Sequence, residues 1–177
     1  MSRHYEMLVQ IANNLKSHYL ENHQVWEGSP FEWIKGGVPS RTKGKVGEEI
    51  VRAFLSNNGF SVTDSPNTDS DLTVNGKKVE VKMSTLWAGD FYRFQQIRQQ
   101  DYDILFCLGI SPHSAYAWTT RKSDIVWDDM ENQHGGSRGS DTWWMTCHEA
   151  HCSHTWMHPQ NGDLAEICSV LRGIIAP

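Results

Sequence analysis

Hydrophobic residues recur at helical spacing near the start of the chain. Tyr5, Leu8, Ala12, Leu15 and Tyr19 are three or four positions apart, which places them on one stripe of a helix. The pattern therefore predicts an N-terminal amphipathic helix, and we expect its apolar stripe to pack on the rest of the domain.

Two further helices are predicted. One runs over about 45–57 and ends at Asn58-Gly59, a common way for a helix to stop, and the other covers 164–175. The positions of the earlier helix that we expect to be buried are Val46, Ile50, Ala53 and Phe54. The preceding segment 27–44 is rich in Gly, Pro and Ser, and it predicts a loop anchored by Trp33.

Shorter segments between the helices have the pattern of strands. Alternation predicts strands at 60–63, 71–74 and 77–83, and the unbroken apolar run 104–108 predicts a strand covered on both faces, with 116–119 as its neighbour. The segment 128–161 is dense in Trp, Gly and His, and we expect it to be irregular. The pattern predicts an α/β fold with a mixed sheet flanked by helices.

Composition narrows the class of protein. The 177 residues, 38% of them hydrophobic, suffice for one domain with a real core, so we expect a single unit over 1–177. The four cysteines do not make a disulfide framework, and we expect reduced thiols. The sequence contains no apolar run of membrane-spanning length and no signal-peptide pattern at its start, so we expect a soluble, cytoplasmic protein without membrane contact.

Charge is distributed unevenly along the chain. The net charge of −5 argues against non-specific coating of nucleic acid. Residues 1–100 carry 12 basic and 11 acidic side chains, whereas 101–177 carry 4 and 10. A basic cluster, which is either a phosphate-binding surface or a solvated loop, comes just before the second helix and consists of Lys35, Arg41, Lys43 and Lys45.

The segment DLTVNGKKVEVK predicts a tight hairpin with Asn75-Gly76 as its two-residue loop. In that register Asp71 lies opposite Glu80, and Lys82 projects on the same face. The opposite face carries the apolar residues Leu72, Val74, Val79, Val81 and Met83.

Two carboxylates facing each other across a hairpin repel unless a cation or a proton lies between them. Mg²⁺ prefers oxygen ligands from one or two carboxylates and keeps waters that phosphate oxygens can replace. The chemistry of such a site suits phosphodiester hydrolysis, with Lys82 holding the attacking water and offsetting charge on phosphorus. The alternative is an ordinary exposed hairpin face with a Glu-Lys neighbour pair.

The runs KGKVGEEIVRAFLSNNGFSV and DSDLTVNGKKVEVK resemble the PD-(D/E)XK nuclease superfamily, which includes restriction endonucleases and archaeal-type Holliday-junction resolvases. The resemblance is strongest over 43–82. It implies a restriction-endonuclease-like core of αβββαβ type and Mg²⁺-dependent DNA cleavage, with Mn²⁺ able to substitute. It also implies an acidic pair at Asp71 and Glu80 and a catalytic lysine at Lys82. Ser70 stands where the family's nominal motif has Pro.

In many such nucleases a glutamate of the first core helix also reaches the metal, and Glu48 and Glu49 compete for that role. Glu48 shares a helix face with Val51 and Leu55, so we favour it. The resemblance agrees, because it places the glutamate four residues after Gly44. The alternative is an exposed acidic pair bound to nearby basic side chains.

Residues flanking these acids are candidates for substrate contact. Arg and Gln can bind phosphate or read base edges, although a polar helix or strand face explains them equally well. The candidates are Lys43, Lys45, Ser84, Arg93, Gln95 and Gln96. Asp69 is a second acid near the site, and we expect it to be an exposed loop residue.

The segment WWMTCHEAHCSHTWMHP places two cysteines and four histidines within twelve positions, Cys147 to His158. Zn²⁺ could take ligands from it, with Cys168 or His134 completing the set. The spacing is not that of a structural zinc site, so we place the metal at the acidic site and keep zinc here as the less favoured alternative. We regard Trp143 and Trp144 as core and rim residues.

These observations predict a Mg²⁺-dependent DNA endonuclease of restriction-like type. The catalytic residues are Glu48, Asp71, Glu80 and Lys82, and the first three are metal ligands. A Holliday-junction resolvase or repair nuclease is the alternative, followed by a non-catalytic DNA-binding or zinc-binding module. We expect a homodimer, because cutting two strands needs paired active sites. Within 1–177 we expect a helix and loop (1–42), a catalytic core (43–120) and a Trp/His-rich extension (121–177).

Overall fold

The computed structural model of the chain describes residues 3–133, 141–148, 151–157 and 162–176. The described helices are α1 (Arg3–Gln24), α2 (Glu32–Gly36), α3 (Ser40–Asn57) and α4 (Leu164–Ile175), with short 3₁₀ turns at Lys122–Asp124 and Trp127–Asp129. The strands are β1 (Val62–Asp64), β2 (Leu72–Val74), β3 (Lys77–Thr85), β4 (Tyr92–Ile97), β5 (Ile104–Ile110), β6 (Ala115–Arg121), β7 (Glu131–Gln133), β8 (Thr142–His148) and β9 (His151–Cys152).

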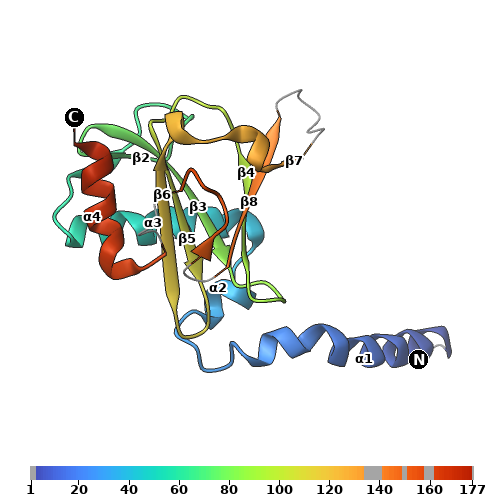
Figure 1. Cartoon of the computed structure of the whole chain (residues 1–177). Coiled ribbons are helices and arrows are strands. Elements are labelled where there is room, and N and C mark those ends of the chain that lie inside the picture. The colour runs from blue at the N-terminus through green and yellow to red at the C-terminus, as the bar shows by residue number, and fades with distance from the viewer. Residues whose placement is uncertain (1–2, 134–140, 149–150, 158–161, 177) are drawn as a thin grey trace.

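A five-stranded sheet in the order β1-β2-β3-β5-β6 forms the centre of the molecule (Figure 1). β3 and β5 are parallel, and the other neighbours in this sheet are antiparallel. All seven residues of β5 are buried, as its unbroken apolar sequence predicts. The predicted α/β fold with a mixed sheet flanked by helices is confirmed.

Helices α3 and α4 cover one face of this sheet and enclose the larger apolar cluster with it. α3 buries Val51 and Leu55, whereas Ala53, which we predicted to be buried, is exposed. The buried positions 47, 51 and 55 recur every four residues, so the face that meets the sheet is rotated from the predicted one. Val46, Ile50 and Phe54 lie at its border and are partly buried.

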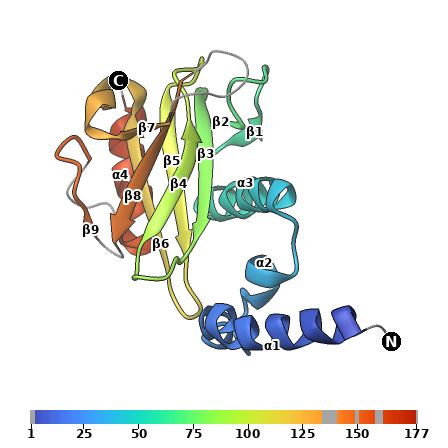
Figure 2. The same cartoon turned by 90° about the vertical axis from the view of Figure 1, so that its right-hand side faces the viewer.

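A second sheet covers the other face, with the order β4-β8-β7 and β9 paired to β8 (Figure 2). Its buried residues Tyr92, Phe94 and Met145 meet Trp118 of β6 in a second apolar cluster. The prediction that 128–161 is irregular is therefore wrong, since β7, β8 and β9 lie within it. The connection between β3 and β5 likewise contains β4, where the αβββαβ order implies a helix.

The segment 27–44 is not a plain loop. It contains α2 and the first turn of α3. Trp33, the predicted anchor, is 52% exposed, and Trp26 and Ile34 are buried instead. Consecutive residues of a helix point in different directions. The short helix α2 therefore turns Ile34 toward the core and Trp33 toward solvent.

Helix α1 projects away from the body of the molecule in both views (Figures 1 and 2). Its described apolar side chains are exposed, at 55% for Tyr5, 64% for Leu8 and 50% for Leu15. The prediction that this stripe packs on the domain is wrong for these residues, and the side chain of Tyr19 lies outside the described part.

None of the described helices combines the length and the apolar content that crossing a membrane requires.

Candidate active site

The hairpin β2–β3 has the predicted register. Val74 pairs with Lys77, and Leu72 pairs with Val79. Asn75 and Gly76 form the loop with φ of 48° and 82°, the positive values that a tight two-residue hairpin requires. As predicted, Leu72, Val74, Val79 and Val81 point into the helix-covered core, with Met83 partly buried beside them.

Asp71 does not continue this ladder. Its backbone N–H donates to the carbonyl of Val79 at 3.0 Å, and its carboxylate Oδ2 accepts from the N–H of Val81 at 2.7 Å. The β2–β3 ladder ends at the pair Leu72–Val79, so Asp71 and Glu80 are not paired in it as predicted, and the carboxylate of Asp71 binds the backbone of β3 instead. A short polar side chain at the end of a strand can satisfy such a backbone N–H directly, and this contact fixes the carboxylate against β3.

Glu80 and Lys82 form an ion pair, with Lys82 Nζ 2.6 Å from Glu80 Oε1. The side chains are 8% and 20% exposed, so this is not the exposed hairpin face of the alternative reading. Both residues pair with the parallel strand β5, at Leu105 and Cys107, on the face that the second sheet covers.

The carboxyl group of Asp71 is half-buried close to that pair. Burial and the negative charge of Glu80 raise the pKa of Asp71 above its ordinary value. The hydrogen bond from Val81 and the positive charges of Lys82 and Lys45 oppose this rise. An acid held beside another acid in this way gains stability when a cation approaches, which is the electrostatic requirement for a metal ligand.

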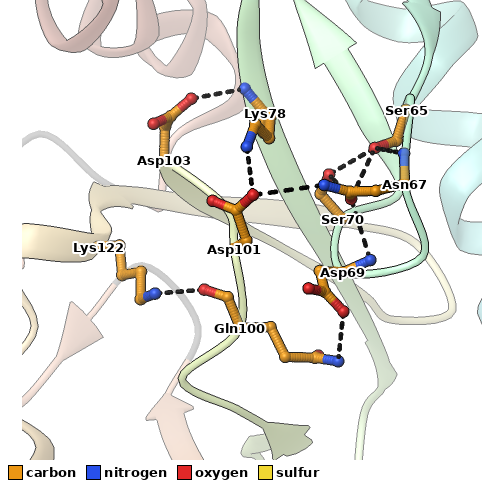
Figure 3. A network of polar contacts seen from close by, with 9 residues as sticks. All are labelled: Ser65, Asn67, Asp69, Ser70, Lys78, Gln100, Asp101, Asp103 and Lys122. Carbon is orange, nitrogen blue, oxygen red and sulfur yellow. Dashed lines mark hydrogen bonds and ion pairs between the residues drawn. The ribbon is translucent and has the colours of Figure 1, made fainter.

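A polar network positions the segment that leads into Asp71 (Figure 3). Asn67 Nδ2 donates to Asp101 at 3.4 Å, and Lys78 Nζ forms an ion pair with the same carboxylate. Asp103 Oδ2 accepts from the Lys78 backbone N–H at 2.8 Å. Asp69 is half-buried and accepts from Gln100 at 3.5 Å, so it belongs to this network and is not the exposed loop acid that we predicted.

Helix α3 brings Glu48 to the site. Its side chain is 21% exposed against 55% for Glu49, the difference that the helical face predicts. Lys45 Nζ lies 2.9 Å from Glu48 and 3.4 Å from Glu49, and both contacts raise the pKa of Lys45. α3 can approach β3 this closely because Gly47 presents only a hydrogen to Met83. A Cβ built at Gly47 would lie 2.6 Å from Met83 Cβ.

A cleft of about 650 Å³ lies between the start of α3, strand β3 and strand β4. Its acidic residues are Asp71 and Glu48, and Lys82 lies beside them. Glu80 and Lys45 do not line it. Of the predicted substrate contacts, those that line the cleft are Lys43, Ser84, Arg93, Gln95 and Gln96.

Ser84 has a structural role that sequence reasoning missed. Its hydroxyl accepts from the N–H of Arg93 at 3.1 Å and donates to the carbonyl of Thr85 at 3.1 Å. The side chain is buried and joins β4 to β3. A bulge in β4 between Phe94 and Ile97, with φ of 57° at Gln96, lets the consecutive residues Gln95 and Gln96 both line the cleft.

The basic cluster does not precede the helix as predicted, because α3 begins at Ser40 and contains Arg41, Lys43 and Lys45. Its members divide between structural contacts and the cleft. Lys35 Nζ donates to the carbonyl of Leu86 at 3.0 Å, and burial together with nearby Lys43 lowers the pKa of Lys35. Lys43 Nζ donates to the carbonyl of Lys35 at 2.7 Å while still lining the cleft, as Arg41 also does. Trp87 lies at the far end of the cleft and was not predicted. The only indication in the sequence was its position, five residues after Lys82.

The Cys/His segment is only partly described. Cys147 and Cys152 pair across β8 and β9 with their sulfur atoms 2.8 Å apart. His134 and His158 lie outside the described residues. Trp143 and Trp144 are partly buried, as expected of rim residues.

Within the described part of the chain, no three His, Cys, Asp or Glu residues converge closely enough to hold a metal ion. This applies to the described residues of the Cys/His segment and also to Glu48, Asp71 and Glu80. Mg²⁺ needs only one or two protein carboxylates, since water and phosphate oxygens complete its shell. The hard oxygen donors of Asp71 and Glu80 fit that requirement, and burial together with the negative charge of Glu80 raises the pKa of Asp71.

No protein-family model matches the chain, and no curated protein matches it. Among solved structures, the chain is similar to the bacterial homing endonuclease I-Ssp6803I, with 16% sequence identity and a TM-score of 0.47. The likeness covers 76% of this chain and 95% of that one. A likeness of this degree assigns neither a family nor a residue role to this chain.

Proposed function

We propose that this chain is a Mg²⁺-dependent DNA endonuclease of the PD-(D/E)XK, restriction-like type. The observation that carries the proposal is the arrangement around the hairpin. The carboxylate of Asp71 is bound to the backbone of the same strand that carries the Glu80–Lys82 ion pair. The cleft beside them has a basic wall at Arg41 and Lys43, which suits a phosphodiester backbone.

Each residue has a defined role in this proposal. Asp71 and Glu80 would hold Mg²⁺, which when bound polarises the scissile phosphate and lowers the pKa of a coordinated water. Lys82 holds the attacking water and offsets the charge that develops on phosphorus. Glu48, the third predicted ligand, lines the cleft on the side of α3, where it would reach the metal directly or through water. Arg41 and Lys43 bind the phosphate backbone along their wall of the cleft.

Supercoiled plasmid DNA tests this proposal directly. We expect nicking in Mg²⁺ or Mn²⁺ and none in EDTA. Lys82→Ala should lower the rate by about 10²–10³-fold, because the stabilisation of the transition-state charge is lost. Lys77→Ala, which removes an exposed amine from the same strand outside the cleft, is the matched control and should cut normally. Absence of metal-dependent nicking by the unmodified protein would overturn the proposal.

A homodimer belongs to the same proposal, because cleavage of both strands requires two active sites. The exposed apolar residues of α1, among them Leu8 and Leu15, suit contact with the same helix of a second copy. Sedimentation measurements of the unmodified protein and of Leu8→Glu should then show a dimer and a monomer, respectively. A monomer in both cases would exclude this interface.

A further inference from the structure

Trp87 forms the end of the cleft beyond the last residues of β3. Its backbone N–H donates to the carbonyl of Phe91 at 2.9 Å and closes a turn in which Gly89 and Asp90 have positive φ. The indole is 41% exposed and lines the cleft, and its ring centroid lies 5.8 Å from that of Phe91. The tight turn therefore holds a large, partly exposed aromatic side chain in a fixed position at the end of the cleft.

Arg93 of β4 lies beside this indole. Its guanidinium carbon is 5.7 Å from the ring centroid of Trp87, 5.5 Å from that of Phe91 and 5.1 Å from that of Trp144. The nearest carboxylate, on exposed Glu131, is 3.8 Å away. Among the described residues, no atom accepts a hydrogen bond from the buried Nε. The positive charge is therefore held mainly by aromatic rings and is only weakly neutralised.

An exposed indole next to a fixed guanidinium has the chemistry of a site for a nucleotide. A base can stack on the aromatic face while its phosphate meets the cation. The bases of an intact duplex are already stacked on one another, so only an unpaired base can lie on such a surface.

We propose that Trp87 and Arg93 form a stacking platform for an unpaired base, so that the preferred substrate is a nucleic acid with a single-stranded segment beside the scissile phosphate. This inference rests on the proposed function for the position of the cut. An extended chain spans at most about 3.6 Å per residue, so Trp87 lies at most about 18 Å from Lys82 along the backbone. The platform therefore receives a base only a few nucleotides from the phosphate that is cut.

Binding measured in EDTA tests the platform without requiring cleavage. The probes are a fluorescein-labelled DNA single strand, the blunt duplex of the same sequence, and that duplex with one unpaired base. Trp87→Ala should weaken binding of the single strand and of the bulged duplex about 5- to 100-fold, the loss expected for one stacked base. The affinity for the blunt duplex should hardly change.

Two variants control for folding and for non-specific aromatic contacts. Trp87→Phe keeps a stacking face and should restore most of the affinity for single strands. Trp33→Ala removes an indole that is 52% exposed and lies outside this cleft, and it should bind all three probes like the unmodified protein. Equal loss for the three probes in Trp87→Ala, or no loss for any, would overturn the platform.

The outcomes separate this inference from the proposed function. Selective loss of single-strand binding in Trp87→Ala, together with no Mg²⁺-dependent cleavage by the unmodified protein, would leave the platform standing and remove the nuclease proposal. Normal Mg²⁺-dependent cleavage by the unmodified protein, together with equal effects of Trp87→Ala on single-strand and duplex binding, would leave the nuclease proposal standing and remove the platform.

Discussion

The two faces of β3 carry side chains of different character, because alternate residues of a strand point to opposite sides of the sheet. Val79 and Val81 belong to the apolar cluster between α3, α4 and the sheet. Glu80 and Lys82 point toward the second sheet, where Glu80 is buried and Lys82 is 20% exposed. Apolar burial on the first face stabilises the fold, whereas the charged pair costs desolvation free energy and contributes chemistry. The residues that stabilise the fold and those with the proposed catalytic role therefore alternate along the same strand.

The apolar face should give the largest change in stability. Leu55 is fully buried between α3 and the sheet, so Leu55→Ala should lower the free energy of unfolding by about 2–5 kcal/mol through lost burial and a new cavity. Urea denaturation would measure this change. Val126→Ala, at a side chain that is 45% exposed and lies outside α1, should change it by less than about 0.5 kcal/mol. Similar losses in both variants would contradict the division between the faces.

On the charged face, removing one partner of the ion pair should destabilise the protein more than removing both. Lys82→Met leaves Glu80 buried without its partner, and we expect a loss of about 3 kcal/mol, near the low end for buried pairs because Lys82 is 20% exposed.

Replacing both charges at once, in Glu80→Leu with Lys82→Met, should recover most of that stability, since no uncompensated charge remains. Both variants should fail to nick plasmid DNA. A double variant as unstable as the single one, in urea denaturation with EDTA present, would mean that the pair itself stabilises the fold.

The contact between α3 and β3 offers a smaller and sharper test. Gly47→Ala would press a Cβ against Met83 and should destabilise the protein by about 1–3 kcal/mol. Gly44→Ala, in open space on the same helix, should instead stabilise it by up to about 1 kcal/mol, as alanine does within helices. Thermal melting of the two variants measures the difference, and equal melting temperatures would contradict the close approach of α3.

Part of this site followed from local sequence alone. The Asn75-Gly76 loop and the alternation around it predicted the register of the hairpin and the side on which Val79 and Glu80 lie. Helical spacing distinguished Glu48 from Glu49 by burial. These predictions succeeded because turn geometry and residue period act over a few neighbouring positions.

Other features depended on residues far apart in the chain. The burial of Glu80 requires a second sheet whose strands come from 92–97 and 131–152, and the latter span had no clear periodicity. Asp71 leaves the ladder to bind Val81, which the pairing rule alone does not anticipate. Trp87 and Trp144 become one cluster with Arg93 only because β4 and β8 are neighbours.

The sequence by itself determined the hairpin, the face of each of its residues and the α/β class, because backbone geometry and hydrophobic period are local properties. Only the tertiary structure decided that the Glu80–Lys82 pair is enclosed, that a cleft runs from Asp71 to Trp87, and that α1 leaves the body of the molecule. These features arise from packing between distant segments, which is set by the shape of the whole fold.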